Sequence, residues 1–429
     1  MQTDILPVNL AQIGVGNTSK PTWIHEWQLD ASNQSQDAEH LRRAAHELRT
    51  SNSPVAFPTE TVYGLGADAT RSAAVQGIYK AKQRPSDNPL IVHVWSLDQV
   101  RELLAPGYAE AGPAEDPIPA IYTPLITKFW PGPLTLIVPN PANSRLAPEV
   151  TAGLSTFGVR MPRNPHALAL LKLANVPLAA PSANASTKPS PTEAEHVKYD
   201  LDGRISTIID GGACDVGVES TVVDGLSSPP SILRPGGISI EQLNSCPGWE
   251  DVVVGYKDNA QSEAKPRAPG MKYKHYSPKA PVVLYEHTRQ LPTQQDIQQY
   301  LGQTRRIGVI RTMRWPHALG LEVVFTNGTN GPSQEKPTQV VLHNDNAQAV
   351  VKVNHFEIAA GPNAKFELLE VDIGQHATRI AQGLFSALRA LDKSNVDAIF
   401  VEGVNDSLGD VSAAVMNRLR KAAEVKIRD

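Results

Sequence analysis

Apolar residues recur at two different spacings along the chain. In DAEHLRRAAHELR, Leu41, Ala44 and Leu48 recur at the three-to-four-residue spacing of a helix. Continuous apolar runs such as 88–94 (NPLIVHV) and 134–139 (LTLIVP) have the length of buried strands. The two spacings alternate, which predicts an α/β domain.

The same alternation continues to residue 243, and we predict one α/β domain over 37–243. Its further expected elements are a strand with a Gly-rich loop (54–67), helices at 72–82, 166–175 and 191–198, and strands at 177–181, 205–210, 218–224 and 231–234. Residues 1–36 are polar and rich in turn residues, which favours an N-terminal arm.

A second α/β pattern follows an irregular stretch. Residues 244–280 are rich in Pro, Gly, Lys and Asn, which is typical of a linker, and PRAPGMKYKHYSP interleaves aromatic and basic residues there. Over 281–429 we expect strands at 282–286, 306–310 and 396–402 and helices at 296–303, 376–392 and 413–424. Strands separated by helices favour a small, mostly parallel, doubly wound sheet.

Composition narrows the class of protein. The chain has 429 residues, 41% hydrophobic and 20% charged, with a formal net charge of −4, so any contact with nucleic acid must be local. Cys214 and Cys246 form no CxxC pair, which predicts neither a disulfide framework nor a cysteine zinc site. Neither a membrane span nor a signal peptide is expected, so we predict a cytoplasmic protein, and an additional mitochondrial pool stays open.

The stretch KAKQRPSDNPLIVH allows two interpretations. Lys80 and Lys82 fall in the last turn of a predicted helix, where cations are favoured by the helix dipole, and this alone favours a simple helix end. However, Arg84, Asn88 and His93 flank a buried strand. Because Lys and Arg offer only donors, several of them at a strand edge also fit a phosphate or carboxylate site.

Two loops carry further candidates. In PTETVYGLGAD, Gly64 and Gly66 permit close approach of a ligand, but the GxG spacing is neither a dinucleotide fingerprint nor a Walker loop. In APSANASTKPSPTEAEH, Ser182 and Asn184 directly follow a strand, which favours a phosphate-binding loop. The SPTE pattern at Ser190 also fits a helix capping box, so Ser190 is either a cap or a ligand residue.

Three more candidates lie on or next to predicted strands, and each alone is typical of a surface: Arg160 comes directly after an apolar strand position, Ser220 lies on a strand, and Arg234 lies near the end of the next strand. Their motifs are VRMP, ESTVVD and ILRPGG, respectively. Neither a metal-type carboxylate cluster nor a Ser-His-Asp order accompanies them. The inventory therefore indicates phosphate handling by cations and hydroxyl groups, with no protein metal site.

Together these motifs resemble, in order, those of the YrdC-like threonylcarbamoyl-AMP synthase family. The matching stretches are FPTETVYGLG, KQR, RPSDNPLIVH, FWPGPLTLIV, VRMP, SAN, ESTVVD and ILRPGG, and the linker and C-terminal pattern resemble the long two-domain form. The resemblance implies a twisted open mixed sheet with a large cationic cavity, plus a smaller C-terminal Rossmann-like parallel domain.

The resemblance also implies a reaction and its partners. ATP, L-threonine and bicarbonate would give threonylcarbamoyl-AMP and pyrophosphate, with Mg²⁺ bound to the phosphates. This is the first step in forming N6-threonylcarbamoyladenosine beside the tRNA anticodon. The adenylate would pass to a downstream tRNA-modifying transferase complex, with at most weak contact to RNA and none to membranes.

Residue roles follow from the resemblance by motif. It implies Thr61, His93, Arg160, Ala180 and Ser220 for threonine; Arg84, Asn88, Thr156, Ser182, Ser190, Arg234 and Tyr276 for ATP; and Lys82, Arg84, Ser182 and Asn184 for catalysis. Tyr273 and Tyr276 of the linker would close over the cavity as a lid.

Two alternatives remain at this point. One is a carbamoyltransferase of the hydrogenase-maturation type, which shares a YrdC-like domain but also carries Cys-rich zinc elements. The other is a non-catalytic RNA-binding module that uses a cationic concavity. Two isolated cysteines disfavour the first, and a net charge of −4 disfavours the second.

Overall fold

The structure is a computed structural model that describes residues 2–16, 18, 22–111, 115–256, 275–286, 290–324, 338–341, 351–361 and 364–428. The chain divides into two compact units: Met1–Ser186 with Ser190–Tyr273, and Thr187–Pro189 with Lys274–Asp429. In the described ranges, no helix has the length and apolar character needed to cross a bilayer.

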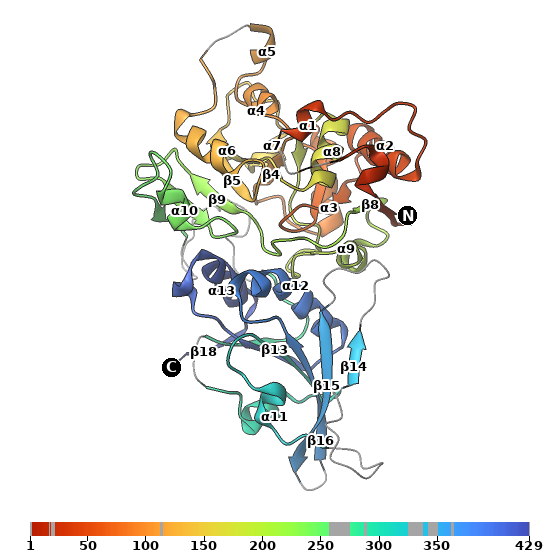
Figure 1. Ribbon diagram of the computed structural model, residues 1–429, viewed down its shortest axis with the longest axis vertical. Coiled ribbons are helices and arrows are strands. Elements are labelled where there is room, and N and C mark those ends of the chain that lie inside the picture. Colours follow the sequence, from red (N-terminus) through yellow and green to blue (C-terminus); the bar gives the residue numbers. More distant parts are fainter. Residues whose placement is uncertain are drawn as a thin grey trace. The chain divides into compact units, whose positions relative to one another are not determined.

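Short, mostly buried strands build a mixed sheet in the first unit (Figure 1). Its order within the described residues is β1-β8-β2-β3-β7-β4-β6-β5-β9-β10-β11. The strands are β1 (Asp4–Pro7), β2 (Val55–Phe57), β3 (Gly64–Asp68), β4 (Ile91–His93), β5 (Leu134–Pro139), β6 (Thr156–Arg160), β7 (Leu178–Ala179), β8 (Thr207–Asp210), β9 (Thr221–Asp224), β10 (Ser231–Arg234) and β11 (Val253–Val254). Parallel and antiparallel pairs alternate irregularly, which confirms the expected mixed sheet.

Helices connect these strands. They are α1 (Trp23–Glu26), α2 (Gln36–Thr50), α3 (Ser72–Lys82), α4 (Leu97–Leu104), α5 (Tyr108–Ala111), α6 (Thr123–Phe129), α7 (Pro148–Thr151), α8 (Pro165–Ala174), α9 (Ala194–Leu201) and α10 (Ile240–Asn244), with 3₁₀ turns η1 (Leu10–Ile13) and η2 (Ala120–Tyr122). In α2, Leu41, Ala44 and Leu48 are buried, as their spacing predicts. Helices α2 and α8 pack against each other.

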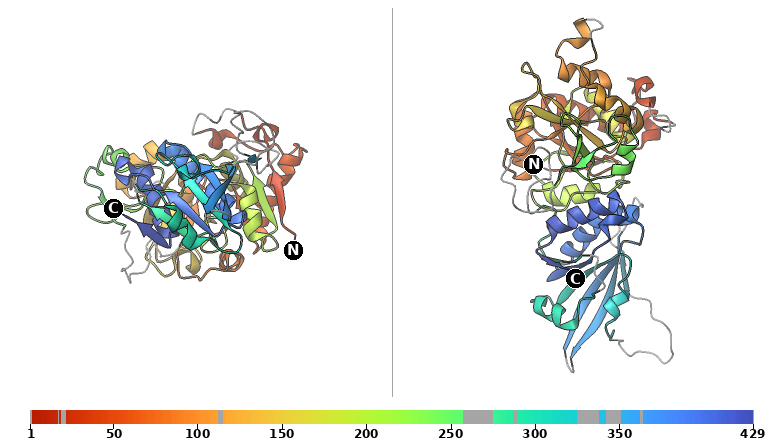
Figure 2. Two further views of the ribbon diagram at one scale, coloured as in Figure 1. Left: turned by 90° about the horizontal axis from the view of Figure 1, so that it is seen from below. Right: turned by 90° about the vertical axis from the view of Figure 1, so that its left-hand side faces the viewer.

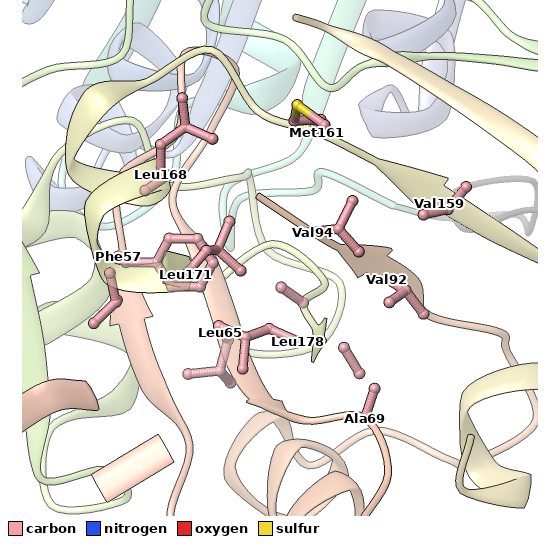
Figure 3. Close-up of a cluster of buried hydrophobic side chains, with 14 of the residues drawn as sticks. Phe57, Leu65, Ala69, Val92, Val94, Val159, Met161, Leu168, Leu171 and Leu178 are labelled. Atoms are coloured by element: carbon pink, nitrogen blue, oxygen red, sulfur yellow. The ribbon is translucent and has the colours of Figure 1, made fainter. Parts of the chain in front are cut away.

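The core of the first unit explains two glycines of the PTETVYGLGAD motif. Figure 3 shows Phe57 of β2 beside Leu171 of α8, with Leu65 of β3 and Leu178 of β7 nearby. Gly66 lies in β3 with no room for a side chain, because a Cβ there would lie 2.7 Å from the Phe57 ring. Gly64 and Gly66 therefore belong to a strand packed on Phe57, and not to the Gly-rich loop that we expected.

Residues 1–36, predicted as an arm, contribute a strand to the sheet. β1 pairs in parallel with β8, from Asp4 beside Thr207 to Pro7 beside Asp210. Ile13, Ile24 and Trp27 are buried in the same core as the rest of the first unit. The predicted linker also begins inside this unit, since β11 pairs with β10 and Trp249 is fully buried.

The second unit has the expected mostly parallel sheet, with helices on both faces (Figure 1). Its order in the described residues is β14-β15-β16-β13-β17-β12-β18. The elements are β12 (Val282–Tyr285), α11 (Gln294–Tyr300), β13 (Arg306–Arg311), η3 (His317–Gly320), β14 (Thr338–Val341), β15 (Lys352–Gly361), β16 (Ala364–Asp372), α12 (Ala377–Lys393), β17 (Ala398–Glu402), η4 (Asp406–Leu408), α13 (Asp410–Ala422) and β18 (Val425–Ile427). The antiparallel pairs β14–β15 and β15–β16 were not predicted, and Figure 2 shows β15 and β16 as its longest strands.

Candidate active site

Arg160 is held where two neighbouring strands end. β4 and β6 run in parallel with His93 beside Arg160, so both reach the carboxyl edge, where α/β sheets usually hold ligands. Arg160 is 3% exposed. Its Nη1 donates to the Thr61 hydroxyl at 2.9 Å and its Nε donates to the carbonyl of Gly132 at 3.2 Å. The fold thus brings together Thr61, His93 and Arg160, three of the residues that we predict to bind the substrate threonine.

Thr59 determines the direction of the Thr61 hydroxyl proton. The Thr59 hydroxyl donates its one proton to the carbonyl of Val62 at 2.7 Å. It must therefore accept in its 2.9 Å contact with the Thr61 hydroxyl. Thr61 consequently donates to Thr59 and accepts from Arg160, which leaves Thr61 one lone pair for a donor group of a ligand.

A buried carboxylate lies against Arg160. Glu60 is 1% exposed, and its Oε1 lies 2.7 Å from Arg160 Nη2. In the described part of the chain, however, neither carboxylate oxygen of Glu60 nor Arg160 Nη2 has a hydrogen bond of normal geometry. Opposite charge therefore pairs Glu60 with Arg160, while the carboxylate oxygens of Glu60 can still accept hydrogen bonds and Nη2 of Arg160 can still donate them.

His93 is buried and uncharged at neutral pH. Its Nδ1 lies 3.3 Å from the carbonyl oxygen of Ile91, which can only accept, so we assign the ring proton to Nδ1. Burial, followed by the positive charge of Arg160, lowers the pKa of His93 to about 3. The Nε2 atom is therefore an acceptor, suited to a hydroxyl group of a ligand.

A second cluster joins Lys82 to the Ser182–Asn184 loop. Lys82 is 2% exposed, and its Nζ donates to the carbonyl oxygens of Ser182 at 2.5 Å and Asn184 at 2.6 Å. The Ser182 hydroxyl donates to Asn184 Oδ1 at 2.5 Å, and Lys82 Nζ lies 3.5 Å from the same oxygen. The two motifs are therefore neighbours, and Lys82 fixes the backbone of the loop.

The two clusters lie on segments that are hydrogen-bonded to each other. The Leu65 N–H donates to the carbonyl of Pro181 at 2.8 Å, and the Ala183 N–H donates to the carbonyl of Tyr63 at 2.8 Å. Gly64 and Ser182 form an antiparallel bridge between these bonds. Backbone hydrogen bonds thus join the PTETVYGLG and SAN motifs, although more than a hundred residues separate them in the sequence.

The opposite ends of the same two strands carry other predicted ATP residues. Asn88 precedes β4 and Thr156 begins β6, so both lie at the amino ends of strands whose carboxyl ends carry His93 and Arg160. Thr156 and Arg160 are separated along the strand by roughly 13 Å. The 9%-exposed Asn88 has an Oδ1 without a hydrogen-bond partner in the described residues.

Arg84 lies in the turn after α3, at the start of the loop that leads to Asn88 and β4. Gln83 ends the helix in a left-handed conformation with φ of 53°, and the Arg84 N–H donates to the Tyr79 carbonyl at 3.0 Å. The Tyr79 hydroxyl donates to the carbonyl of Asn88 at 2.9 Å, and burial raises the pKa of Tyr79 to about 12. Tyr79 therefore remains a neutral donor that holds the loop between Arg84 and Asn88.

Ser190 is not a helix cap. Helix α9 begins at Ala194 with Glu193 in the N-cap position, so the capping-box alternative is wrong. The fully buried Ser190 hydroxyl donates instead to Glu219 Oε1 at 2.5 Å. Ser190 is thereby tied to the residue before Ser220.

Ser220 is held by Arg234 and Thr135. Arg234 donates from Nε and Nη2 to the Ser220 carbonyl at 3.0 and 2.9 Å, and from Nη2 to the Ser220 hydroxyl at 3.0 Å. The hydroxyl groups of Thr135 and Ser220 lie 2.8 Å apart. Gly236 packs so closely on this strand that a Cβ would lie 2.3 Å from the Thr221 nitrogen. Arg234 and Gly236 of the ILRPGG motif therefore hold the ESTVVD segment in place.

The remaining predicted residues are placed as follows. Ala180 is buried and its N–H donates to the carbonyl of Ile91 at 2.9 Å, so the backbone group left for a ligand is its carbonyl.

Tyr276 belongs to the second unit, where its ring stacks on His275 at 4.2 Å and lies 5.2 Å from the ring of Phe385. Tyr273 lies outside the described residues, and the lid stays a prediction.

Sequence reasoning missed four residues of these networks: Thr59, Glu60, Thr135 and Glu219. Thr59 and Glu60 adjoin Thr61 in PTETVYGLG, and Glu219 adjoins Ser220 in ESTVVD. All four residues lie in or next to the matched motifs, but an anion site built from cations gives no reason to expect the carboxylates.

Known proteins resemble the whole chain. A family model described as "Telomere recombination" matches residues 47–236, and one described as "Threonylcarbamoyl-AMP synthase, C-terminal domain" matches 238–424. The threonylcarbamoyl-AMP synthase of Schizosaccharomyces pombe is 46% identical over 90% of this chain and 88% of its own length. That of Bacillus subtilis is 42% identical over 92% and 97%.

A solved structure resembles both units. The chain titled "Crystal structure of P. abyssi Sua5 complexed with L-threonine" has a TM-score of 0.68 and 33% identity, with 99% of this chain and 100% of that chain covered. The present chain belongs to the threonylcarbamoyl-AMP synthase family, in its two-domain form.

Proposed function

We propose that the protein is an L-threonylcarbamoyladenylate synthase, which converts ATP, L-threonine and bicarbonate to threonylcarbamoyl-AMP and pyrophosphate. The observation that carries the proposal is the antiparallel contact at Gly64 and Ser182, which places the Arg160–Thr61 cluster and the Lys82–Asn184 cluster on adjacent segments. Family membership supports the reaction, and a structural relative is titled as a complex with L-threonine.

The contacts support a division of roles. Arg160 suits the α-carboxylate of threonine, His93 Nε2 suits its hydroxyl, and Thr61, Ala180 and Ser220 would complete that side. In the first unit, residues proposed for ATP are Arg84, Asn88, Thr156, Ser182, Ser190 and Arg234, and those proposed for the reacting phosphate are Lys82, Arg84, Ser182 and Asn184. The role of Tyr276, which belongs to the second unit, stays a prediction from the family resemblance.

The chemistry needs fixed donors rather than a covalent nucleophile. The threonine amine first forms a carbamate, whose oxygen attacks the α-phosphorus of ATP and expels pyrophosphate. Orientation and preorganised donors account for most of the rate enhancement in such a step. The buried charge of Lys82, held by two carbonyl oxygens, would act from a fixed position and keep Ser182 and Asn184 in place.

Mg²⁺ would enter with ATP as part of the substrate. Among the described residues, no group of three or more His, Cys, Asp or Glu side chains is placed to hold a metal ion. Mg²⁺ typically keeps several waters and binds through substrate phosphates. We therefore assign it no protein ligand of its own.

Omission of single substrates tests the function. Pyrophosphate release by the full-length protein should require ATP, bicarbonate and L-threonine together, and threonylcarbamoyl-AMP should appear in equal amount. Release that is independent of threonine or bicarbonate would contradict the proposal. Hand-off of the adenylate to a tRNA-modifying transferase complex, weak RNA contact, and a cytoplasmic location with an additional mitochondrial pool stay predictions.

A further inference from the structure

The carboxylate of Glu60 lacks the hydrogen bonds that its burial demands. It is 1% exposed and in charge contact with Arg160 at 2.7 Å, yet neither oxygen has a well-oriented donor within the described residues. A buried ion pair is favourable only when further hydrogen bonds satisfy the remaining lone pairs and protons. The pair is therefore matched to a ligand that brings both donors and acceptors.

Arg160 shows the complementary feature. Its Nε and Nη1 donate to Gly132 and Thr61, but Nη2 has no hydrogen bond of normal geometry in the described part of the chain. A guanidinium has five N–H donors in a planar fork that fits a carboxylate. A cation that can still donate hydrogen bonds and an anion that can still accept them thus lie next to each other.

We propose that Glu60 accepts the α-ammonium group of the substrate amino acid while Arg160 binds its α-carboxylate. An α-amino acid carries a carboxylate and an ammonium on adjacent atoms, which matches an adjacent guanidinium and carboxylate. The inference rests on the proposed function, because that function supplies the amino acid. Glu60 then also selects an amine over a hydroxyl at the α-carbon.

The same contact gives the ammonium proton a destination. Only a free amine can attack carbon, so one ammonium N–H bond must break, with its electron pair kept by nitrogen and its proton taken by a Glu60 oxygen. The amine attacks the carbon of bicarbonate, and the bicarbonate hydroxyl leaves as water with a second nitrogen proton. The balance is ammonium, bicarbonate and carboxylate to carbamate, water and carboxylic acid.

The neighbouring groups are poor alternatives for this proton. The Nδ1 proton of His93 faces the carbonyl of Ile91, and its Nε2 is the acceptor already assigned to the substrate hydroxyl. The Thr61 hydroxyl can accept a hydrogen bond from the ammonium, but its own proton is committed to Thr59. Both residues fit binding of the substrate better than removal of its proton.

Glu60→Gln tests the proposal, because it keeps the shape and one acceptor but removes the charge. In calorimetry with the full-length protein, its Kd for L-threonine should rise at least 10-fold, as for one lost hydrogen bond to a charged group, with ATP binding changed less than twofold. Glu47→Gln is the control: Glu47 accepts from Thr207 at 2.7 Å on the α2 side of the sheet and should bind threonine normally.

A second ligand separates binding from mere support of Arg160. The α-hydroxy analogue of threonine keeps the carboxylate and lacks the ammonium. The wild type should bind it at least 10-fold more weakly than threonine, and this preference should nearly vanish in Glu60→Gln. Equal weakening of both ligands would make Glu60 a support for Arg160 and overturn the proposal.

The remaining outcomes are also decisive. If Glu60→Gln does not fold, equal affinity of the wild type for both ligands would still overturn the proposal, because it excludes an ammonium acceptor. Normal threonine binding and turnover by a folded Glu60→Gln would overturn the role of Glu60 alone. Absence of threonine binding by the wild type would overturn the proposed function together with it.

Discussion

A buried ammonium group requires oxygen partners, and Lys82 obtains them from the backbone of a distant loop. Its bonds to the carbonyls of Ser182 and Asn184 span about a hundred residues of sequence. The interpretation of Lys82 as part of a simple helix end is therefore wrong for its side chain, although it does lie in the last turn of α3. The exposed Lys80 fits the helix-end interpretation.

We predict that Lys82→Ala lowers pyrophosphate release by about 10²–10³-fold, and Arg84→Ala by a similar factor, as for the loss of one transition-state donor. For Lys82 the loss also leaves two buried carbonyl oxygens without their donor. Initial rates at saturating substrates measure the effect. Lys80→Ala, two residues earlier on the exposed face of α3, is the matched control and should keep near-normal activity.

His93 should make stability depend on pH. Its pKa is about 3 in the folded protein, against about 6.5 for an unfolded histidine, so the unfolded state binds more protons between these values. Stability from this group is present above pH 6.5 and is lost as the pH falls toward 3. Between pH 7 and pH 5 the loss should be about 2 kcal/mol.

Urea unfolding of wild type and His93→Gln at pH 7 and pH 5 measures this loss. The variant should lose less stability than the wild type on acidification. His166 also has a lowered pKa because of burial, but it is present in both proteins and cancels from the difference. Equal losses in the two proteins would contradict the prediction.

At the level of elements, local patterns predicted helices well and closely packed glycines poorly. The positions of α2 and α3 follow from apolar spacing, because a helix that covers a sheet buries one face. Helices α8 and α12 were also predicted, although consecutive residues bury them on more than one face. Gly66 was assigned to a loop because GxG is usually a turn. Its actual role is steric, and only the position of the Phe57 ring reveals it.

Gly66→Ala should therefore destabilise the first unit by about 1–3 kcal/mol, the usual cost of overpacking a core. The new Cβ would lie 2.7 Å from Phe57 Cε1, and Leu in place of Phe57 should recover part of the loss. Denaturant midpoints measure both variants. Gly16→Ala is the control, since a Cβ there meets nothing within 4 Å, and an equal loss in the control would refute the steric explanation.

At the scale of the whole molecule, the N-terminal segment closes one side of the large sheet. β1 pairs with β8, and Leu6, Val8 and Ile13 join the core. Polar composition alone suggested an arm, because a four-residue strand is too short to show a period.

We predict that deletion of residues 1–16 lowers the melting temperature and promotes association, since β8 becomes an exposed edge. Thermal unfolding and size-exclusion chromatography measure the two effects. Leu6→Asp should reproduce the loss of stability through a 6%-exposed side chain, while the exposed Gln2 tolerates the same replacement. An unchanged melting temperature after the deletion would contradict the prediction and show that residues 1–16 do not stabilise the sheet.

Local spacing and residue chemistry are enough to predict the two α/β patterns, the order of the motifs and the inventory of cations and hydroxyl groups. Which of these groups meet depends on how the folded chain packs. Glu60 with Arg160, Lys82 with the SAN loop and Ser190 with Glu219 join segments 29 to 102 residues apart. Such pairs produce no periodic pattern in the sequence. They form because the packing of other residues buries these charges and hydroxyl groups together, and buried polar groups require hydrogen-bonding or charged partners.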